Sequence, residues 1–261
     1  MRLSASPPAG LRPLKVRKLF DLLLREYGPQ RWWPAEEPFE VAVGAVLTQN
    51  TSWANVEKAI AGLKSAGRLD PEWLAEAPLE RIASLIRPAG CHNVKADRLR
   101  ELCRFLIRHG GLEGLQRLGH REQRTGLLSV RGVGPETADS ISLYALGFPV
   151  FVADGYARRL FSRLGLIHGD VKYDDFRHLV ESSEPVRGRS GAKFYNEYHA
   201  LIVQHGKLRC RTTPRCRKCP LLNRCGHGKR VLESESSGIV LMTRPARRTK
   251  RRARPRSRER P

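Results

Sequence analysis

The stretch that decides the fold is S-V-R-G-V-G-P-E-T-A-D, residues 129–139. Gly132 and Gly134 permit a tight backbone turn, and Pro135 stands where the first turn of a helix tolerates proline. The stretch therefore predicts a helix, a short hairpin and a second helix. The N–H groups of the turn and of the second helix would point outward together and form an anion site. A plain corner between two helices can carry the same glycines, so this stretch alone leaves both interpretations open.

Apolar residues recur at intervals of three and four along most of the chain, as they do in L-K-V-R-K-L-F-D-L-L-L-R-E-Y-G (14–28). Only the short F-P-V-F-V-A-D (148–154) alternates as a strand would. The fold class predicted is all-α. The helices are expected at residues 14–28, 38–49, 54–65, 71–86, 94–109, 121–130, 136–146, 155–164, 172–182 and 190–204.

The charge balance favours a polyanionic partner. The net charge is +22, of which residues 244–261 supply +9, so residues 1–243 are basic in their own right. Such a balance indicates nucleic acid before membrane. From about residue 231 the apolar periodicity is lost, and residues 231–261 are expected to form a disordered basic tail. No run of apolar residues has the length of a signal peptide or a membrane span, which predicts a cytoplasmic location. The protein is also expected to be nucleoid-associated and a monomer.

Four of the six cysteines lie within sixteen residues, in the pattern C-x5-C-x2-C-x5-C formed by Cys210, Cys216, Cys219 and Cys225. In a reducing compartment this crowding favours metal ligation over disulfides. Zinc sites usually draw on two separated C-x2-C pairs, and only one is present. Four thiolates looped tightly around one point suit a [4Fe-4S] cluster, while zinc and unliganded thiols are the alternatives.

Taken together, several segments resemble the endonuclease III superfamily of DNA glycosylases. L-L-S-V-R-G-V-G-P-E-T-A-D-S-I-S-L-Y-A-L-G and F-V-A-D-G-Y-A-R-R-L-F-S-R-L-G are similar to its helix-hairpin-helix and catalytic-aspartate segments. A-V-L-T-Q-N-T-S-W-A-N-V, G-C-H-N-V-K-A-D-R-L-R-E-L and the cysteine cluster occur in the family's order, although the first cysteine gap has five residues where the family has six. The resemblance covers about residues 14–226.

The resemblance implies a helix-hairpin-helix glycosylase fold of two helical lobes with the DNA cleft between them. Residues 37–149 would form a helical barrel domain with the hairpin motif at 125–146. Both ends of the chain, 1–36 and 150–230, would form the second lobe and carry the [4Fe-4S] loop at 210–225. The partner implied is double-stranded DNA that contains a damaged base.

Two acids are the candidate catalytic residues. From local sequence Asp154 is a helix N-cap, whereas the resemblance makes it the essential aspartate, whose carboxylate would stabilise positive charge on the deoxyribose and orient a water. Bifunctional relatives have a nucleophilic lysine where this chain has Glu136. A glutamate cannot form a Schiff base, so hydrolytic base removal is expected and lyase activity is in doubt. Glu136 can also be a first-turn acid that stabilises its helix.

Aromatic residues supply a candidate base pocket. A flipped base needs aromatic faces to stack on, and Trp32, Trp33, Pro34 and Trp53 are candidates, although W-W-P can equally be a packed turn. Together with Glu136 they resemble the 3-methyladenine glycosylase branch of the superfamily. An alkylated purine is cationic, so it would gain cation-π energy from tryptophan and attraction from the glutamate.

The remaining candidates contact DNA. Gln49 matches the residue that the family inserts into the gap left by the flipped nucleotide, or it caps a helix C-terminus. Lys95 is a candidate phosphate contact, or a solvated charge. Gly132, Val133 and Gly134 would supply the hairpin's grip on the backbone. The function predicted is a monofunctional alkylbase glycosylase; a bifunctional glycosylase/lyase acting on oxidised pyrimidines and a non-catalytic iron-sulfur DNA-binding protein are the alternatives.

Overall fold

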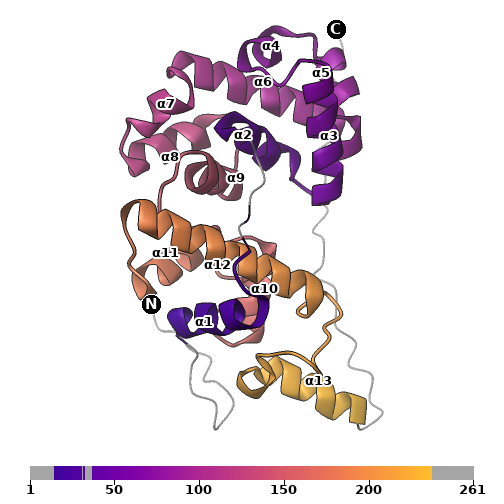
Figure 1. The fold of residues 1–261 in the computed structure, drawn as a ribbon, viewed down its shortest axis with the longest axis vertical. Helices are drawn as coiled ribbons and strands as arrows, with labels where there is room; N and C mark the ends of the chain where they lie inside the picture. The colour runs from indigo at the N-terminus through magenta and orange to yellow at the C-terminus, as the bar shows by residue number, and fades with distance from the viewer. Residues whose placement is uncertain (1–14, 31, 33–36, 237–261) are drawn as a thin grey trace, which may run out of the picture.

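The computed structural model describes residues 15–30, 32 and 37–236, and within these ranges it is helical without a β-strand. The all-α prediction is confirmed. Figure 1 shows the helices of residues 38–140 in the upper part of the view and the helices of residues 16–27 and 155–236 in the lower part. They are α1 (Val16–Tyr27), α2 (Pro38–Leu47), α3 (Trp53–Ser65), α4 (Pro71–Glu76), α5 (Leu79–Leu85), α6 (His92–Arg108), α7 (Gly111–Gln116), α8 (His120–Ser129), α9 (Pro135–Ser140), α10 (Gly155–Arg163), α11 (Tyr173–Ser183), α12 (Gly188–Leu208) and α13 (Gly226–Ser236), with short turns η1 (Arg87–Ala89), η2 (Ile141–Ala145, π-helical) and η3 (Leu222–Arg224).

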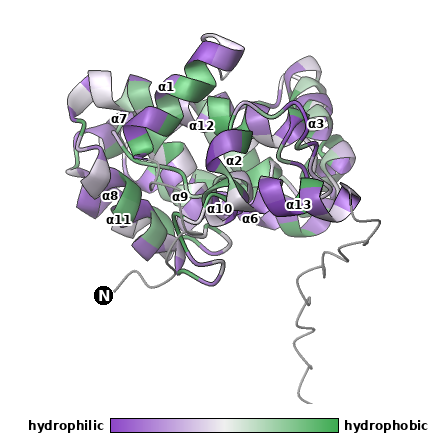
Figure 2. Cartoon of the chain, turned by 90° about the horizontal axis from the view of Figure 1, so that it is seen from below, coloured by the Kyte–Doolittle hydropathy of each residue, from purple (hydrophilic) through white to green (hydrophobic). Residues whose placement is uncertain are grey.

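Buried apolar side chains of the described residues form two clusters. The first core cluster is built by α2 to α9 and η2, and spans residues 41–146. The second core cluster joins α1 to the chain from residue 143 to 221, so the start of the chain packs against its later half. Figure 1 shows this directly, since the indigo α1 lies beside the orange α12. Most helices carry both hydrophobic and hydrophilic residues, as expected of helices with one buried face (Figure 2).

An ion-pair network ties the hairpin helix α9 to α8 and α11. Asp139 is fully buried, and its Oδ1 accepts a hydrogen bond of 2.6 Å from Nε of Arg124. Arg124 also donates to Asp174, and Nε of Arg177 lies 3.6 Å from Asp139. Removing one member of a buried pair leaves an uncompensated charge, which costs about 3–5 kcal/mol. The network therefore fixes the orientation of the helix that follows the hairpin.

The helix boundaries depart from the prediction in three places. A single helix was expected over 71–86, but Pro78 lacks the N–H that a continuous helix needs, and α4 ends before it while α5 begins after it. Helices α7 and α13 were not predicted. The predicted start of the disordered tail at 231 lies inside α13, which continues to Ser236, and residues 237–261 lie outside the described part of the chain.

Among the described residues, no helix combines the length and the apolar character that crossing a bilayer requires.

Candidate active site and cysteine-lined cavity

An open pocket lies where the two core clusters meet. Its empty volume is about 890 Å³, part of which is open to solvent. It is lined by the loop after α2, by α3, α9, η2, the 152–154 segment, α10 and α12. Several of the residues predicted from the sequence meet here: Trp32, Gln49, Trp53, Glu136 and Asp154, together with Tyr144, His199 and Lys207.

Asp154 is held at the N-terminus of α10. Its Oδ1 accepts a hydrogen bond of 2.7 Å from the backbone N–H of Ala157, which confirms the helix-cap interpretation. Its Oδ2 lies 3.5 Å from Nε2 of His199, and only 12% of the Asp154 side chain is exposed. The capping role and a chemical role are compatible because each carboxylate oxygen faces a different group.

Glu136 lies in the first turn of α9, as an acid favoured by the helix dipole would, and it lines the same pocket. The side chain still meets the solvent of the open pocket. Partial desolvation and the neighbouring Asp154 carboxylate raise its pKa, against the opposing effect of His199 and Arg158. Two nearby acids in one pocket favour sharing a proton over carrying two charges.

Sequence reasoning missed Tyr144 and His199. His199 is 8% exposed, and Tyr144 hydrogen-bonds its Nδ1 through the phenol oxygen. The two residues are 55 positions apart on η2 and α12, so no local motif links them. Burial and the Asp154 charge raise the pKa of Tyr144, which therefore keeps its hydroxyl proton. The only signal in the sequence was a histidine among the apolar residues of a long helix.

The aromatic candidates are placed in part. The ring of Trp32 stacks on His199 with a centroid distance of 6.0 Å, and Nζ of Lys207 lies 5.3 Å from its centroid. Trp53 begins α3, packs against the first core cluster and lines the pocket. Trp33 and Pro34 lie outside the described residues.

Gln49 joins the loop after α2 to the hairpin. Its Nε2 donates to the carbonyl of Gly132 at 3.2 Å and to Oγ1 of Thr137 at 2.9 Å, and its Oε1 accepts a hydrogen bond from Arg98. The C-cap of α2 is Thr48, so the alternative role of Gln49 as that cap is not observed. Gln49 instead lies at the border of the pocket, half-buried.

The predicted hairpin forms between α8 and α9. Gly132 has a φ of 90°, which only glycine adopts readily, and Gly134 is the N-cap of α9. Val133 is buried and anchors the turn through its N–H, which donates to Val130 O at 3.0 Å. The first-turn amides of α9 have no preceding helical turn to bond. The backbone therefore has the geometry expected of an anion site.

Lys95 requires a correction. The side chain is 2% exposed, and Nζ donates to the carbonyls of Leu47 and Ala89 at 2.8 and 2.7 Å. Burial lowers its pKa. Lys95 thus satisfies carbonyls at the ends of two helical segments inside the first core cluster, and its ammonium group does not reach a DNA phosphate.

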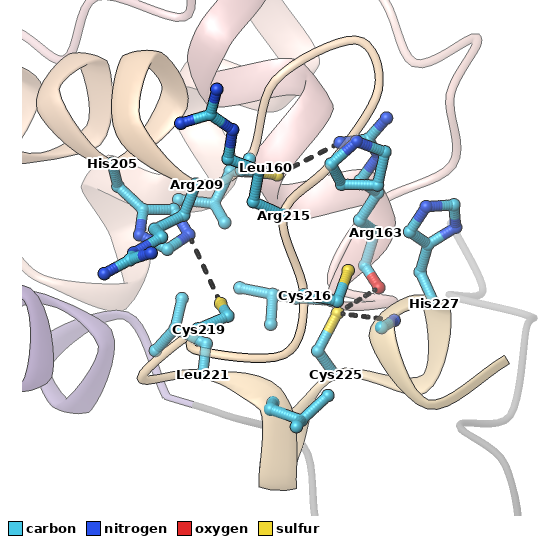
Figure 3. Close-up of a pocket in the computed structure, with 15 residues that line it drawn as sticks. Leu160, Arg163, His205, Arg209, Arg215, Cys216, Cys219, Leu221, Cys225 and His227 are labelled. Atoms are coloured by element: carbon cyan, nitrogen blue, oxygen red, sulfur yellow. Dashed lines mark hydrogen bonds between the residues drawn. The ribbon is translucent and has the colours of Figure 1, made fainter. Parts of the chain in front are cut away.

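The four clustered cysteines line a second cavity, of about 360 Å³ of empty volume, between α10, the end of α12 and α13. Figure 3 shows Cys216, Cys219 and Cys225 around it, with His205 and Arg163 at its sides. Sulfur atoms of a tetrahedral zinc site lie about 3.8 Å apart, because Zn–S bonds are about 2.3 Å. In the described part of the chain no three His, Cys, Asp or Glu side chains are grouped closely enough for a single metal ion. The four cysteines nevertheless share this one cavity.

Helix α10 connects the two cavities. Its N-cap is Asp154, and its last turns carry Arg159 and Arg163. Nε of Arg159 donates to the carbonyl of Cys210 at 2.7 Å, and Arg163 donates to the carbonyl of Arg211 at 2.6 Å and of Thr212 at 2.9 Å. The loop that carries the cysteines is therefore bound to the helix that positions the pocket aspartate.

Residues 43–185 match the model of the HhH-GPD superfamily base excision DNA repair proteins. A Methanocaldococcus jannaschii protein, named as a candidate DNA repair glycosylase, is 44% identical over 213 residues, which are 80% of this chain and 95% of the relative. Endonuclease III of Bacillus subtilis is 26% identical over 78% of this chain and 86% of its own length.

Solved structures give the same result. Helicobacter pylori 3-methyladenine DNA glycosylase (MagIII), bound to 1,N6-ethenoadenine, aligns with a TM-score of 0.64 and 29% identity over 74% of this chain and 98% of that one. An endonuclease III–DNA complex aligns with a TM-score of 0.71 and 25% identity over 84% and 97%. The family model alone spans more than half of the sequence, and these relatives agree with it. The chain belongs to the HhH-GPD superfamily of base excision DNA repair proteins.

Proposed function

We propose that this chain is a monofunctional DNA glycosylase that extrudes an alkylated purine, such as 3-methyladenine, from double-stranded DNA and hydrolyses its N-glycosidic bond. The observation that carries the proposal is the pocket in which Asp154 and Glu136 lie together, with Glu136 on the hairpin helix where a lyase would need a lysine. The expected fold context is two helical lobes with the DNA in the cleft between them.

Asp154 is the proposed catalytic residue. As the bond between C1′ and the base nitrogen breaks, its electron pair leaves with the base and the deoxyribose becomes positive. A carboxylate at about 4 Å, with an effective dielectric near 20, attracts that charge by about 4 kcal/mol, or roughly a thousandfold in rate. A water then attacks C1′ and gives its proton to the carboxylate.

The base preference is proposed from the charge of the pocket. A base alkylated at N3 or N7 is cationic, so it is attracted by Glu136 and by the tryptophan faces, by up to about 2 kcal/mol for a desolvated cation-π contact. The Lys207 ammonium lies over the ring of Trp32, so a base that stacks there has to displace it. Its positive charge also makes the alkylated base a good leaving group without a general acid.

The DNA contacts proposed are backbone amides and one inserted side chain. The turn at Gly132, Val133 and Gly134 would bind phosphate through N–H groups at the start of α9. Gln49, which already lies between the pocket and the hairpin, would fill the gap left by the extruded nucleotide.

A [4Fe-4S] cluster is proposed for the second cavity, held by Cys210, Cys216, Cys219 and Cys225. Burial, together with the neighbouring cysteines, raises the pKa of the Cys219 thiol to about 11, so a positively charged group would favour the thiolate form. When bound, the cluster would supply a structural link for the arginine-rich loop. Exposed Arg211, Arg215 and Arg217 could then meet phosphates.

The test is a base-release assay over duplexes that hold alkylated purines, oxidised pyrimidines, uracil or thymine mismatches. Release of the alkylated purines that leaves an intact abasic strand is expected. Release confined to a neutral base would overturn the substrate assignment, and no release from any duplex would overturn the enzymatic function.

One observation favours the bifunctional alternative. Lys207 is the lysine among the described residues that line the pocket, and its amine could attack C1′ in place of the missing hairpin lysine. Borohydride trapping on duplexes with an abasic site separates the two functions. The monofunctional enzyme forms no adduct, whereas the alternative forms one that disappears in Lys207→Ala.

A further inference from the structure

Two side chains, the buried His199 and the half-buried Tyr144, lie next to the pocket carboxylate, and the proposed mechanism does not use them. His199 approaches Oδ2 of Asp154 through Nε2 at 3.5 Å, while Tyr144 hydrogen-bonds the opposite ring nitrogen, Nδ1. Trp32 covers the imidazole face. Residues of η2, α12 and the N-terminus of α10 thus form one line of groups that ends on the reactive acid.

The histidine nitrogen that faces Asp154 is an exception to normal burial. Nε2 of His199 is buried and makes no hydrogen bond with any described residue, and its contact with Asp154 is longer than a good hydrogen bond. Buried polar atoms are usually paired, because an unpaired one loses the free energy of its hydration. An orphan atom that points at a pocket acid requires an explanation.

The two carboxylate oxygens of Asp154 have different roles. Oδ1 is fixed by the N–H of Ala157, so it belongs to the fold. Oδ2 faces His199 and is the oxygen left to receive a proton. Tyr144 hydrogen-bonds one side of the His199 ring and Trp32 stacks on its face, so the orientation of the ring is fixed. A ring in a fixed orientation can in turn fix the direction of Oδ2.

We infer that Tyr144 and His199 are positioning residues for Asp154, and that His199 takes over the proton that Asp154 receives from the attacking water. The inference rests on the proposed function. In the step concerned, the water oxygen bonds to C1′, its proton passes to Oδ2 and then to the lone pair of Nε2, and the carboxylate is restored. Nδ1–H then donates to the Tyr144 oxygen, which keeps its own proton.

The step requires an unprotonated Nε2, so the rate should fall at low pH. The charged and titratable groups around His199 are Asp154 on α10, Glu136 on α9, Tyr144 on η2 and Lys207 on α12. The fall in rate at low pH therefore reflects all of these groups together. A substitution of His199 is needed to identify the contribution of His199.

The kinetic test is the pH profile of single-turnover base release by the full chain. His199→Gln keeps an amide near the position of Nε2 but cannot take up a proton, and it is expected to slow release by about 10- to 100-fold and to move the low-pH limb. Adding Tyr144→Phe to it should cost little more, because both act through one ring. His168→Gln, an exposed histidine outside the pocket, is the control. A slower variant with an unchanged pH profile overturns the proton step.

A second measurement needs no substrate. The NMR titration midpoint of the His199 ring should fall in Asp154→Asn, because the neighbouring negative charge is lost. An unchanged midpoint overturns the inference whatever the protein releases. Failure of the unsubstituted protein to release any base overturns the proposed function instead, so the two failures can be told apart.

Discussion

The two ends of α10 serve two cavities of opposite character. At its N-terminus the pocket is lined by two acids, Asp154 and Glu136, and the pKa of Glu136 is raised. The buried Nε2 of His199 has no hydrogen-bond partner among the described residues. At its C-terminal end the cavity is lined by the four cysteines, by basic side chains and by no acid of the described residues, and Arg159 and Arg163 donate hydrogen bonds to the carbonyls of the cysteine loop. Basic side chains line the cavity at the end of the helix that supports a loop, and acids line the pocket at the end where chemistry is proposed.

Both ends nevertheless obey the same electrostatic rule. An acid at a helix N-terminus and arginines at its C-terminus are each stabilised by the helix dipole, by about 0.3–1 kcal/mol. Asp154 and Arg163 are therefore placed as ordinary helix residues would be. The difference arises in what the rest of the molecule brings to each end, and variants at the two ends can measure it.

The largest effect is expected for Asp154→Asn. Asparagine caps a helix as well as aspartate does, so the Tm should change little, while single-turnover base release should fall by about a thousandfold. Asp70→Asn is the matched control, because Asp70 caps α4 by accepting from Trp73 N at 2.6 Å and lies away from the pocket. Equal base release by Asp154→Asn and the parent would contradict the proposed mechanism.

The opposite end is tested by Cys216→Ser. If the four cysteines hold a cluster, the variant should lose the brown visible absorption and its iron, and the Tm should fall by more than about 5 °C because metal binding contributes directly to folding. Cys91→Ser, at an exposed cysteine, should change neither the iron content, with its absorption, nor the Tm. An unsubstituted protein that contains no iron when expressed with iron supplied would refute the cluster.

Glu136→Gln should have a smaller, selective effect. Loss of the carboxylate is expected to reduce release of a cationic base by about tenfold relative to a neutral one. Because the pKa of Glu136 is raised, the charge appears only as the pH rises through that value, so the preference for a cationic base should grow with pH in the parent and stay flat in the variant. Glu122→Gln, an exposed first-turn acid of α8, is the control. Identical selectivity of Glu136→Gln and the parent would remove Glu136 from substrate choice.

The smallest effect is expected in the salt dependence of DNA binding, which distinguishes the exposed charge of Arg211 from the buried charge of Lys95. Arg211→Ala should reduce the slope of log K for DNA against log salt by about 0.9, the value for one phosphate contact. Lys95→Met should leave that slope unchanged but lower stability by about 1–3 kcal/mol, because it leaves the carbonyls of Leu47 and Ala89 without their donor. Salt titrations and thermal melts of both variants give the two values. A reduced slope for Lys95→Met would restore Lys95 as a DNA contact.

The sequence predicted most of the helices because their buried faces repeat at helical spacing. It missed α7, whose residues G-L-E-G-L-Q include two glycines that oppose helix formation. The helix packs against α6, and its second glycine is required by the local fold, because a Cβ on Gly114 would be 1.7 Å from the carbonyl oxygen of His109. The break at Pro78 was visible in the sequence and was outweighed by the apolar pattern around it.

The candidate site was predictable where the chain carries a contiguous motif, as it does around Glu136 and Asp154. His199 and Tyr144 were not predictable, because only the packing of α12 against η2 brings them to Asp154. Lys95 was misplaced for a related reason. In a basic chain the sequence does not distinguish a buried lysine from an exposed one. Only the structure reveals that the ammonium group of Lys95 donates to two carbonyl oxygens.

The turn at Gly132 carries a consequence for natural variation. A Cβ on this residue would stand 2.3 Å from Cγ of Arg98, and Arg98 is the donor that holds Gln49 at the pocket border. One added methyl group would thus displace an arginine and remove one hydrogen bond from Gln49, the glutamine that donates to the carbonyl of Gly132 itself. Homologues that lack glycine at this position should have exchanged the other two residues as well, so the three positions are expected to change together in evolution.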